Sequence, residues 1–110
     1  DFTFTPQPNA GSKTPPHQGV VCHGVDLRGV PDAEVWAAGV NIDYLVDAYN
    51  NLGIGEKFFK PVFEKLIGVG YVREMILAGC SAAEIKARWA DDVVRFKELR
   101  RKYLLYKEAE

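Results

Sequence analysis

Proline is distributed very unevenly along this 110-residue chain, and its placement constrains the fold more than any other feature. Five of the six prolines lie within the first 31 residues: Pro6, Pro8, Pro15, Pro16 and Pro31. Proline lacks a backbone N–H and fixes φ, so helix interiors and central strands exclude it. Residues 1–31 are therefore predicted to be extended and rich in loops.

The start of this region carries a strand pattern. In "DFTFT" (residues 1–5), Phe2 and Phe4 alternate with polar neighbours, as they would in a half-buried strand. The next segment, "PQPNAGSKTPPHQG", is predicted to be a long ordered loop. Within it, Asn9 and Lys13 carry groups that can hydrogen-bond a polar ligand or pair with a carboxylate, although a solvated turn is the commoner explanation of such a pattern.

The run "VVCHGVDLRGV" (residues 20–30) resumes the strand pattern. Alternation places His23 on one face and Cys22, Asp26 and Arg28 on the other. Neighbours on a strand point to opposite faces, so Cys22 and His23 are not expected to form a nucleophile and base pair. A small buried thiol and a structural histidine are favoured instead.

From Asp32 the apolar period changes from two to about 3.6. The pattern predicts one long helix, capped by Asp32 and ending near "NNLGIG" (residues 50–55). Its apolar positions are Ile42, Leu45, Val46, Tyr49 and Leu52. After a short connector or strand at 56–61, Pro61 is expected to open a helical turn.

Two further helices complete the helical part. A short one is expected over residues 71–78, closing at Gly79. The best-defined one covers residues 81–103, where Ser81 and Glu84 form a capping box. Its apolar stripe consists of Ile85, Trp89, Val93, Phe96, Leu99 and Tyr103. Residues 104–106 are expected to dock on the body and 107–110 to fray.

These elements predict an α+β fold: a few-stranded sheet from the N-terminal third, packed under three or four helices. We expect residues 1–110 to form one domain, with an extended region at 1–31, a helical region at 32–106 and a frayed tail at 107–110. The abrupt strand-like beginning suggests a mature or excised piece of a longer chain. Any export signal would then lie upstream.

Charge and hydropathy exclude several classes of partner. Fourteen Lys and Arg against 15 Asp and Glu leave a formal net charge of −1, so no overall field attracts nucleic acid or an anionic membrane. The longest apolar stretches are broken well short of the roughly 18 residues that a membrane span needs. The expectation is a soluble chain with no membrane span and no nucleic-acid partner.

Metal and disulfide chemistry are not indicated. Cys22 and Cys80 lie far apart, without a CxxC motif or a histidine at metal-ligand spacing. Two unpaired buried thiols are favoured over a disulfide, and neither a metal nor a cofactor is expected.

A helix-turn-helix is one alternative interpretation of "ILAGCSAAEIKARW" (residues 76–89). Lys86 and Arg88 would face DNA, but Asp91 and Asp92 follow within one turn and would repel phosphates. Two helices packed at a corner around Trp89 explain the same pattern. A helical module that docks on another protein is a separate alternative.

Taken together, two pieces of the chain resemble a known family. The first is the Cys-x-Gly-Val-Asp-Leu run at residues 22–27, with the loop before it. The second is the ordered ending made of Gly79, Ser81, Glu84, Ile85, Trp89, Phe96, Arg100 or Arg101, and residues 103–106. They are similar to the C-terminal part of the bacterial exo-β-N-acetylmuramidases of Bacteroidota type, glycoside hydrolases formerly known as a domain of unknown function.

The resemblance implies a two-domain enzyme that removes N-acetylmuramic acid from the non-reducing ends of peptidoglycan fragments. A larger, Rossmann-like N-terminal domain would carry the catalytic carboxylate, and the C-terminal domain would help to wall the cleft. The larger domain is absent from these 110 residues, so they contain no catalytic residue on this reading and should be inactive alone. Cell-wall substrates imply an envelope or secreted location.

The resemblance also suggests a role for the polar residues of the N-terminal third. Residues 9–28 would face the cleft and bind a muropeptide or amino sugar. Lys13 or Arg28 would pair with the lactyl carboxylate, and Asn9, His23 and Asp26 would bind sugar hydroxyls. An equally weighted alternative is that Asp26 and Arg28 hold the loop structurally.

Overall fold

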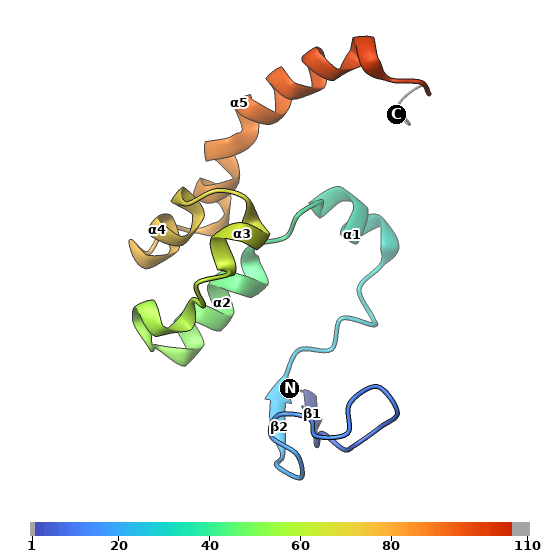
Figure 1. The fold of residues 1–110 in the computed structure, drawn as a ribbon, viewed down its shortest axis with the longest axis vertical. Coiled ribbons are helices and arrows are strands. Elements are labelled where there is room, and N and C mark those ends of the chain that lie inside the picture. Colours follow the sequence, from blue (N-terminus) through green and yellow to red (C-terminus); the bar gives the residue numbers. More distant parts are fainter. Residues whose placement is uncertain (1, 107–110) are drawn as a thin grey trace. The chain divides into compact units, whose positions relative to one another are not determined.

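The structure is a computed structural model that describes residues 2–106. It divides into two compact units, Asp1–Gly39 and Val40–Glu110. The expected fraying of 107–110 lies outside the described residues. Figure 1 shows a pair of strands in the first unit and a group of helices in the second.

The first unit is built on a two-stranded antiparallel sheet. Strand β1 covers Phe2–Phe4 and strand β2 covers Cys22–Gly24, with Phe2 opposite Gly24 and Thr3 opposite His23. The loop between them is closed at its base because the Gly19 N–H donates to the carbonyl of Pro6 at 3.0 Å. The two strand segments predicted from the apolar alternation, and the loop predicted between them, are thus present.

Strand β2 is shorter than the alternation over residues 20–30 predicts. Pairing stops at Gly24, and the Asp26 carboxylate then accepts the backbone N–H of Arg28 at 3.0 Å. This local turn competes with strand extension. A second turn follows, in which the N–H of Val30 donates to the carbonyl of Leu27 at 3.1 Å.

The single long helix expected from Asp32 is in fact two helices, α1 (Asp32–Ala38) and α2 (Asp43–Leu52). The break falls at Gly39, whose φ of 58° and ψ of −128° suit glycine and no other residue well. The Asn41 Oδ1 then accepts the backbone N–H of Asp43 at 2.9 Å and helps α2 to start. Asp32 is not the cap, because the N-cap position of α1 is Pro31.

The second unit contains α2 and three further α-helices: α3 (Phe63–Ile67), α4 (Tyr71–Leu77) and α5 (Ala82–Arg100). A 3-10 helix, Gly55–Phe58, stands where a connector or strand was expected, and another, Arg101–Tyr103, follows α5. With five α-helices and the small sheet in the described residues, the α+β class is confirmed. The break at Gly39 accounts for the additional helix.

The core of the second unit forms where α2, α4 and α5 meet. Its buried members are Ile42, Val72, Ile76, Ala82 and Ile85. Beside them, the Tyr49 and Phe59 rings are 5.8 Å apart, and the Phe59 and Phe63 rings are 4.7 Å apart. These aromatic contacts tie α2 and α3 to the segment between them.

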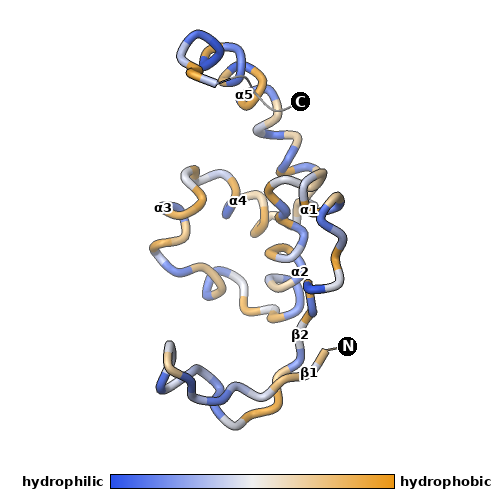
Figure 2. Tube along the Cα trace, turned by 90° about the vertical axis from the view of Figure 1, so that its right-hand side faces the viewer, coloured by the Kyte–Doolittle hydropathy of each residue, from blue (hydrophilic) through white to orange (hydrophobic). Residues whose placement is uncertain are grey.

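Helix α5 begins as predicted but continues beyond the core. The capping box is confirmed, because Ser81 Oγ accepts the Glu84 N–H at 3.3 Å and the Glu84 carboxylate accepts the Ser81 N–H at 2.8 Å. The apolar stripe is buried at Ile85 and half-buried at Trp89, then exposed to the end of the helix. Residues 104–106 do not dock on the body, contrary to expectation: Leu105 is 92% exposed and Tyr106 86%. Figure 2 shows hydrophobic and hydrophilic positions alternating along α5.

Candidate functional site

The Asn9 side chain holds its own loop in shape. Its Oδ1 accepts the backbone N–H groups of Gly11 at 2.9 Å and Ser12 at 2.8 Å, and the backbones of Asn9 and Ser12 also exchange hydrogen bonds. This Asx turn occupies the amide oxygen and leaves the amide NH2 as the group that can donate to a ligand. Lys13 follows the turn directly and is exposed.

His23 lies on β2 opposite Thr3 and is exposed to solvent. Within residues 2–106, neither His23 nor Lys13 makes a side-chain hydrogen bond or ion pair. Both side chains can therefore meet a ligand without breaking a contact. Cys22, next to His23, is half-buried and its Sγ lies 3.5 Å from the carbonyl oxygen of Val20.

Asp26 and Arg28 form the best-defined polar arrangement of the first unit. The guanidinium Nε lies 2.9 Å from Asp26 Oδ1, and Nη2 lies 2.6 Å from Oδ2. These hydrogen bonds lower the pKa of Asp26 and raise that of Arg28, so both groups stay charged at neutral pH. The Arg28 guanidinium also lies over the ring of Phe2, 5.6 Å from its centroid.

The pairing leaves much of the guanidinium available. Arginine has five N–H donors, and the bonds to Asp26 use the Nε–H and one N–H of Nη2. Three donors therefore remain on the outer edge, and the Arg28 side chain is 81% exposed. Two of those donors lie side by side on Nη1 and Nη2, the geometry that binds a second carboxylate in a bidentate manner.

A shallow hollow adjoins this pair. It measures about 460 Å³ and is lined by Phe2, Gly24, Val25 and Asp26. The Phe2 ring stacks with Phe4, with centroids 6.0 Å apart and an interplanar angle of 23°. An aromatic face beside a carboxylate suits the apolar face and the hydroxyls of a sugar ring.

The structure brings together only part of the set expected from the sequence. Asp26 and Arg28 are in direct contact, whereas no hydrogen bond or ion pair between described residues joins them to Asn9, Lys13 or His23. Sequence reasoning missed Phe2 as a member of the site. The signal that could have found it is the hairpin register, since β1 must pair with β2 and thereby places Phe2 opposite Gly24.

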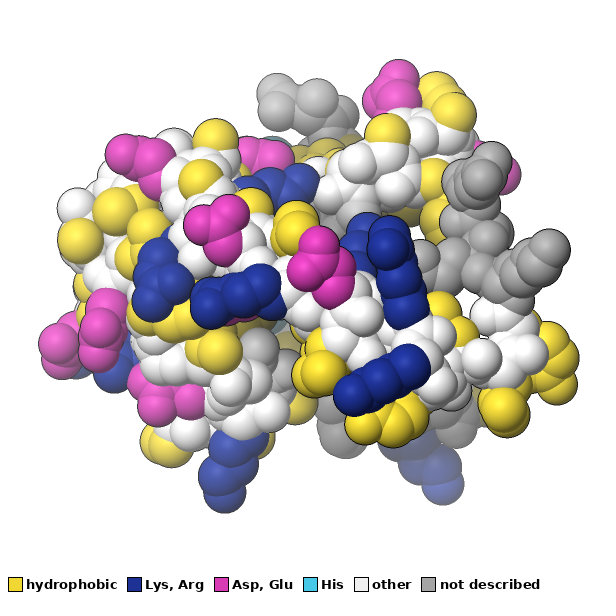
Figure 3. Space-filling model, turned by 90° about the horizontal axis from the view of Figure 1, so that it is seen from above, with side chains coloured by type: hydrophobic (Ala, Val, Ile, Leu, Met, Phe, Trp, Pro, Cys, Tyr) yellow, Lys and Arg dark blue, Asp and Glu magenta, His cyan; other side chains and the backbone are white. Residues whose placement is uncertain are grey.

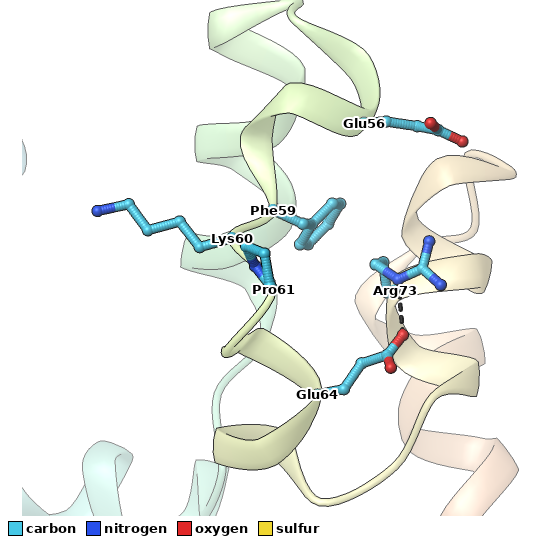
Figure 4. Close-up of a pocket in the computed structure, with 6 residues that line it drawn as sticks. All are labelled: Glu56, Phe59, Lys60, Pro61, Glu64 and Arg73. Atoms are coloured by element: carbon cyan, nitrogen blue, oxygen red, sulfur yellow. Dashed lines mark hydrogen bonds and ion pairs between the residues drawn. The ribbon is translucent and has the colours of Figure 1, made fainter.

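A second pocket, of about 300 Å³, lies in the helical unit (Figure 4). It is lined by Glu56, Phe59, Lys60, Pro61, Glu64 and Arg73. The Arg73 Nε donates to Glu64 Oε1 at 2.8 Å, which raises the pKa of Arg73, while Lys60 points away from this pair. The ion pair links α3 to α4, and we interpret this pocket as structural.

Cys22 and Cys80 are both free, half-buried thiols. In residues 2–106, no three His, Cys, Asp or Glu side chains gather closely enough to hold a metal ion, and no helix has the length and apolarity to cross a bilayer. In the helix-turn-helix segment, the Arg88 guanidinium lies 4.8 Å from the ring centroid of Tyr71.

Comparisons with known proteins agree on one family. Residues 1–106 match the family model described as exo-beta-N-acetylmuramidase NamZ, C-terminal. The chain is 32% identical over 98 residues to the peptidoglycan beta-N-acetylmuramidase NamZ of Bacillus subtilis (strain 168). The matched region covers 82% of this chain and 22% of that protein. It also superposes on the crystal structure of a DUF1343 family protein from Bacteroides fragilis NCTC 9343, with 52% identity and a TM-score of 0.92, covering 99% of this chain and 31% of that one.

The fold and these matches define a small α+β domain of a peptidoglycan muramidase family. The chain belongs to the NamZ C-terminal family, as the resemblance in the sequence indicates. It spans about a fifth of the length of the curated relative and about a third of the chain in the solved structure.

Proposed function

We propose that this domain forms the substrate-cleft half of an exo-β-N-acetylmuramidase that releases N-acetylmuramic acid from the non-reducing ends of peptidoglycan fragments. Its membership of the NamZ C-terminal family supports the class of enzyme. The observation that carries the substrate assignment is the outward edge of Arg28, held by Asp26 beside an aromatic-lined hollow.

The chemistry of the substrate explains why such an arrangement would be useful. N-acetylmuramic acid differs from N-acetylglucosamine by a lactyl ether that carries a carboxylate. A guanidinium with two parallel N–H groups free recognises that carboxylate selectively, and Lys13 is the second candidate cation. Asn9, His23 and Asp26 would bind hydroxyl or acetamido groups of the sugar, and Phe2 would pack on the apolar face of the ring.

The remainder of the enzyme would lie elsewhere in a longer chain. On this proposal the larger N-terminal domain supplies the catalytic carboxylate, so residues 1–110 bind and orient substrate and perform no bond cleavage. A peptidoglycan substrate would place the enzyme in the cell envelope or outside the cell. A module that binds another protein through its helices is the second candidate function, and the exposed end of α5 favours it.

The first experiment compares the longer parent protein with residues 1–110. Release of N-acetylmuramic acid from a MurNAc-GlcNAc disaccharide would be measured for both, with GlcNAc-GlcNAc as the control substrate that lacks the lactyl carboxylate. We expect activity on the first disaccharide by the parent only. An inactive but well-folded parent would remove the muramidase proposal and place the interaction module first.

A further inference from the structure

The C-terminal half of α5 and the residues that follow it present an apolar surface that the other elements of the helical unit leave exposed. We call it the α5 stripe: Val93, Phe96, Leu99, Tyr103, Leu104, Leu105 and Tyr106. The exposed fraction is 59% for Phe96, 57% for Leu99 and 70% for Tyr103. Because Val93, Phe96 and Leu99 continue the spacing of Ile85 and Trp89, this part of the stripe extends the buried face of the helix beyond the core.

The size of the stripe matches a protein interface. With roughly 200 Å² for each large side chain, its seven members expose on the order of 800 Å², about one partner's share of a standard interface. The largest apolar patch on an ordinary monomer is about 300–600 Å². The stripe is also continuous through Val93 with an apolar groove lined by Val40, Ile67, Val69, Tyr71, Val72 and Trp89.

The total surface of the chain supports the same conclusion. It exposes 9371 Å², whereas a folded monomer of its mass of 12.3 kDa exposes about 6,100 Å² and two separate globules of the sizes of its units about 7,300 Å². The excess remains when the two units are counted as separate globules. It is the surface expected of a piece whose partner is elsewhere.

The charges around the stripe indicate what covers it. Positions 93–106 contain five basic residues and one acidic residue, Glu98, and Asp92 directly precedes them. Figure 3, seen from above, shows basic side chains among hydrophobic and acidic ones. A complementary surface would be an apolar groove rimmed by carboxylates.

We propose that the α5 stripe docks into such a groove on the part of the family's longer chain that these residues do not span. The relatives are long enough to contain such a groove outside the matched region, since this chain covers 22% of one relative and 31% of the other. The inference rests on the proposed two-part enzyme and adds the surface through which the two parts are held together.

Two other occupants fit less well. A second copy of the chain would bring two cationic rims together across a two-fold axis. A bilayer would have to accept Asp92, which lies one turn before Phe96 on the same side of the helix and pairs with Arg95. We therefore assign the stripe to the remainder of the parent chain.

The test uses the longer parent protein with one cysteine added, besides Cys22 and Cys80, at either of two matched positions. Leu99 and Val94 are equally exposed here, at 57% and 56%, but by helical spacing Val94 lies on the opposite side of α5. Leu99→Cys and Val94→Cys would be labelled with a thiol reagent and followed by peptide mass spectrometry. We expect position 99 to react at least tenfold more slowly than position 94, and equal rates would overturn the proposal.

A crosslinking experiment identifies the occupant. Tyr103 would be replaced by p-benzoyl-phenylalanine, which keeps an aromatic ring, and the parent irradiated at several concentrations. We expect crosslinks to residues outside 1–110 of the same chain at every concentration. Crosslinks to residues 2–39, crosslinks that require high concentration, or protection of position 99 that needs vesicles of phosphatidylglycerol would each overturn it.

The outcomes separate this inference from the proposed function. Release of N-acetylmuramic acid would be measured on the same parent samples. Protection and crosslinking without muramidase activity would retain the docking surface and remove the proposed function. Muramidase activity with full labelling at position 99 would retain the proposed function and remove the docking surface.

Discussion

The carboxylate of Asp26 binds Arg28 twice, through the backbone N–H at 3.0 Å and through the guanidinium at 2.6–3.1 Å. The first bond shapes the turn and the second orients the side chain over Phe2. One carboxylate thus positions both the backbone and the charged head of Arg28. Its structural role and the proposed binding role are therefore combined in the same pair.

Removing the guanidinium should reveal which role dominates. In the parent enzyme, Arg28→Ala is expected to raise KM for a MurNAc-containing disaccharide by about 10- to 100-fold with kcat little changed, because a charge-assisted pair contributes about 1.5–3 kcal/mol. Arg28→Lys should fall between, since an ammonium keeps the charge but loses the planar fork. Steady-state kinetics and thermal unfolding would be measured together.

Lys65→Ala, at an exposed cation of the helical unit, is the matched control for that series and should leave KM unchanged. If Arg28→Ala lowers the unfolding temperature while KM stays constant, the pair is structural and the binding role is wrong.

The capping box at the start of α5 is expected to contribute measurably to stability. Ser81→Ala removes the side-chain acceptor of the Glu84 N–H and should lower the free energy of unfolding by about 1 kcal/mol, within a range of 0.5–2 kcal/mol. Ser81→Thr keeps a hydroxyl and should therefore retain most of the free energy of unfolding that Ser81→Ala loses. Urea denaturation checks this, and equal losses in both variants would exclude the cap as the cause.

The same motif predicts a pH dependence. Hydrogen bonds from Ser81 lower the pKa of Glu84 below its usual 4.5 in the folded state. The ionised carboxylate therefore stabilises the fold at pH above about 4.5, and this stabilisation is lost as the pH falls through the lowered folded-state pKa.

The comparison of wild type with Glu84→Gln should isolate that effect. Their unfolding temperatures are expected to differ most at pH 5–7 and to converge towards pH 3. A difference that stays constant over this range would mean that ionisation of Glu84 does not contribute.

The core of the helical unit depends on Ile85, whose side chain is fully buried. Ile85→Ala should destabilise the chain by about 2–5 kcal/mol, because it removes buried methyl groups and leaves a cavity. Val94→Ala, at a 56% exposed position of the same helix, is the control and should change stability by less than about 0.5 kcal/mol. Comparable losses at both positions would contradict the burial pattern.

Sequence reasoning succeeded where the determining contacts are local. The proline-rich loop, the two strand segments, the capping box at Ser81 and Glu84 and the end of α4 near Gly79 all depend on residues within a few positions of one another. It failed at Gly39, where the apolar period continues from α1 towards α2 although the backbone takes a conformation that interrupts the helix. Periodicity records which side chains are apolar and is insensitive to one backbone angle.

The sequence by itself determined the class of fold, the order of its elements, the family and the residue types available at the candidate site. Only the tertiary structure decided that Phe2 lies under Arg28 and that three N–H groups of the Arg28 guanidinium point outward. It also decided that the apolar stripe of α5 is buried at Ile85 but exposed from Val93 onward. The physical reason is that periodicity identifies an apolar face but not its partner. Burial and pairing between distant residues depend on which other segments reach that face.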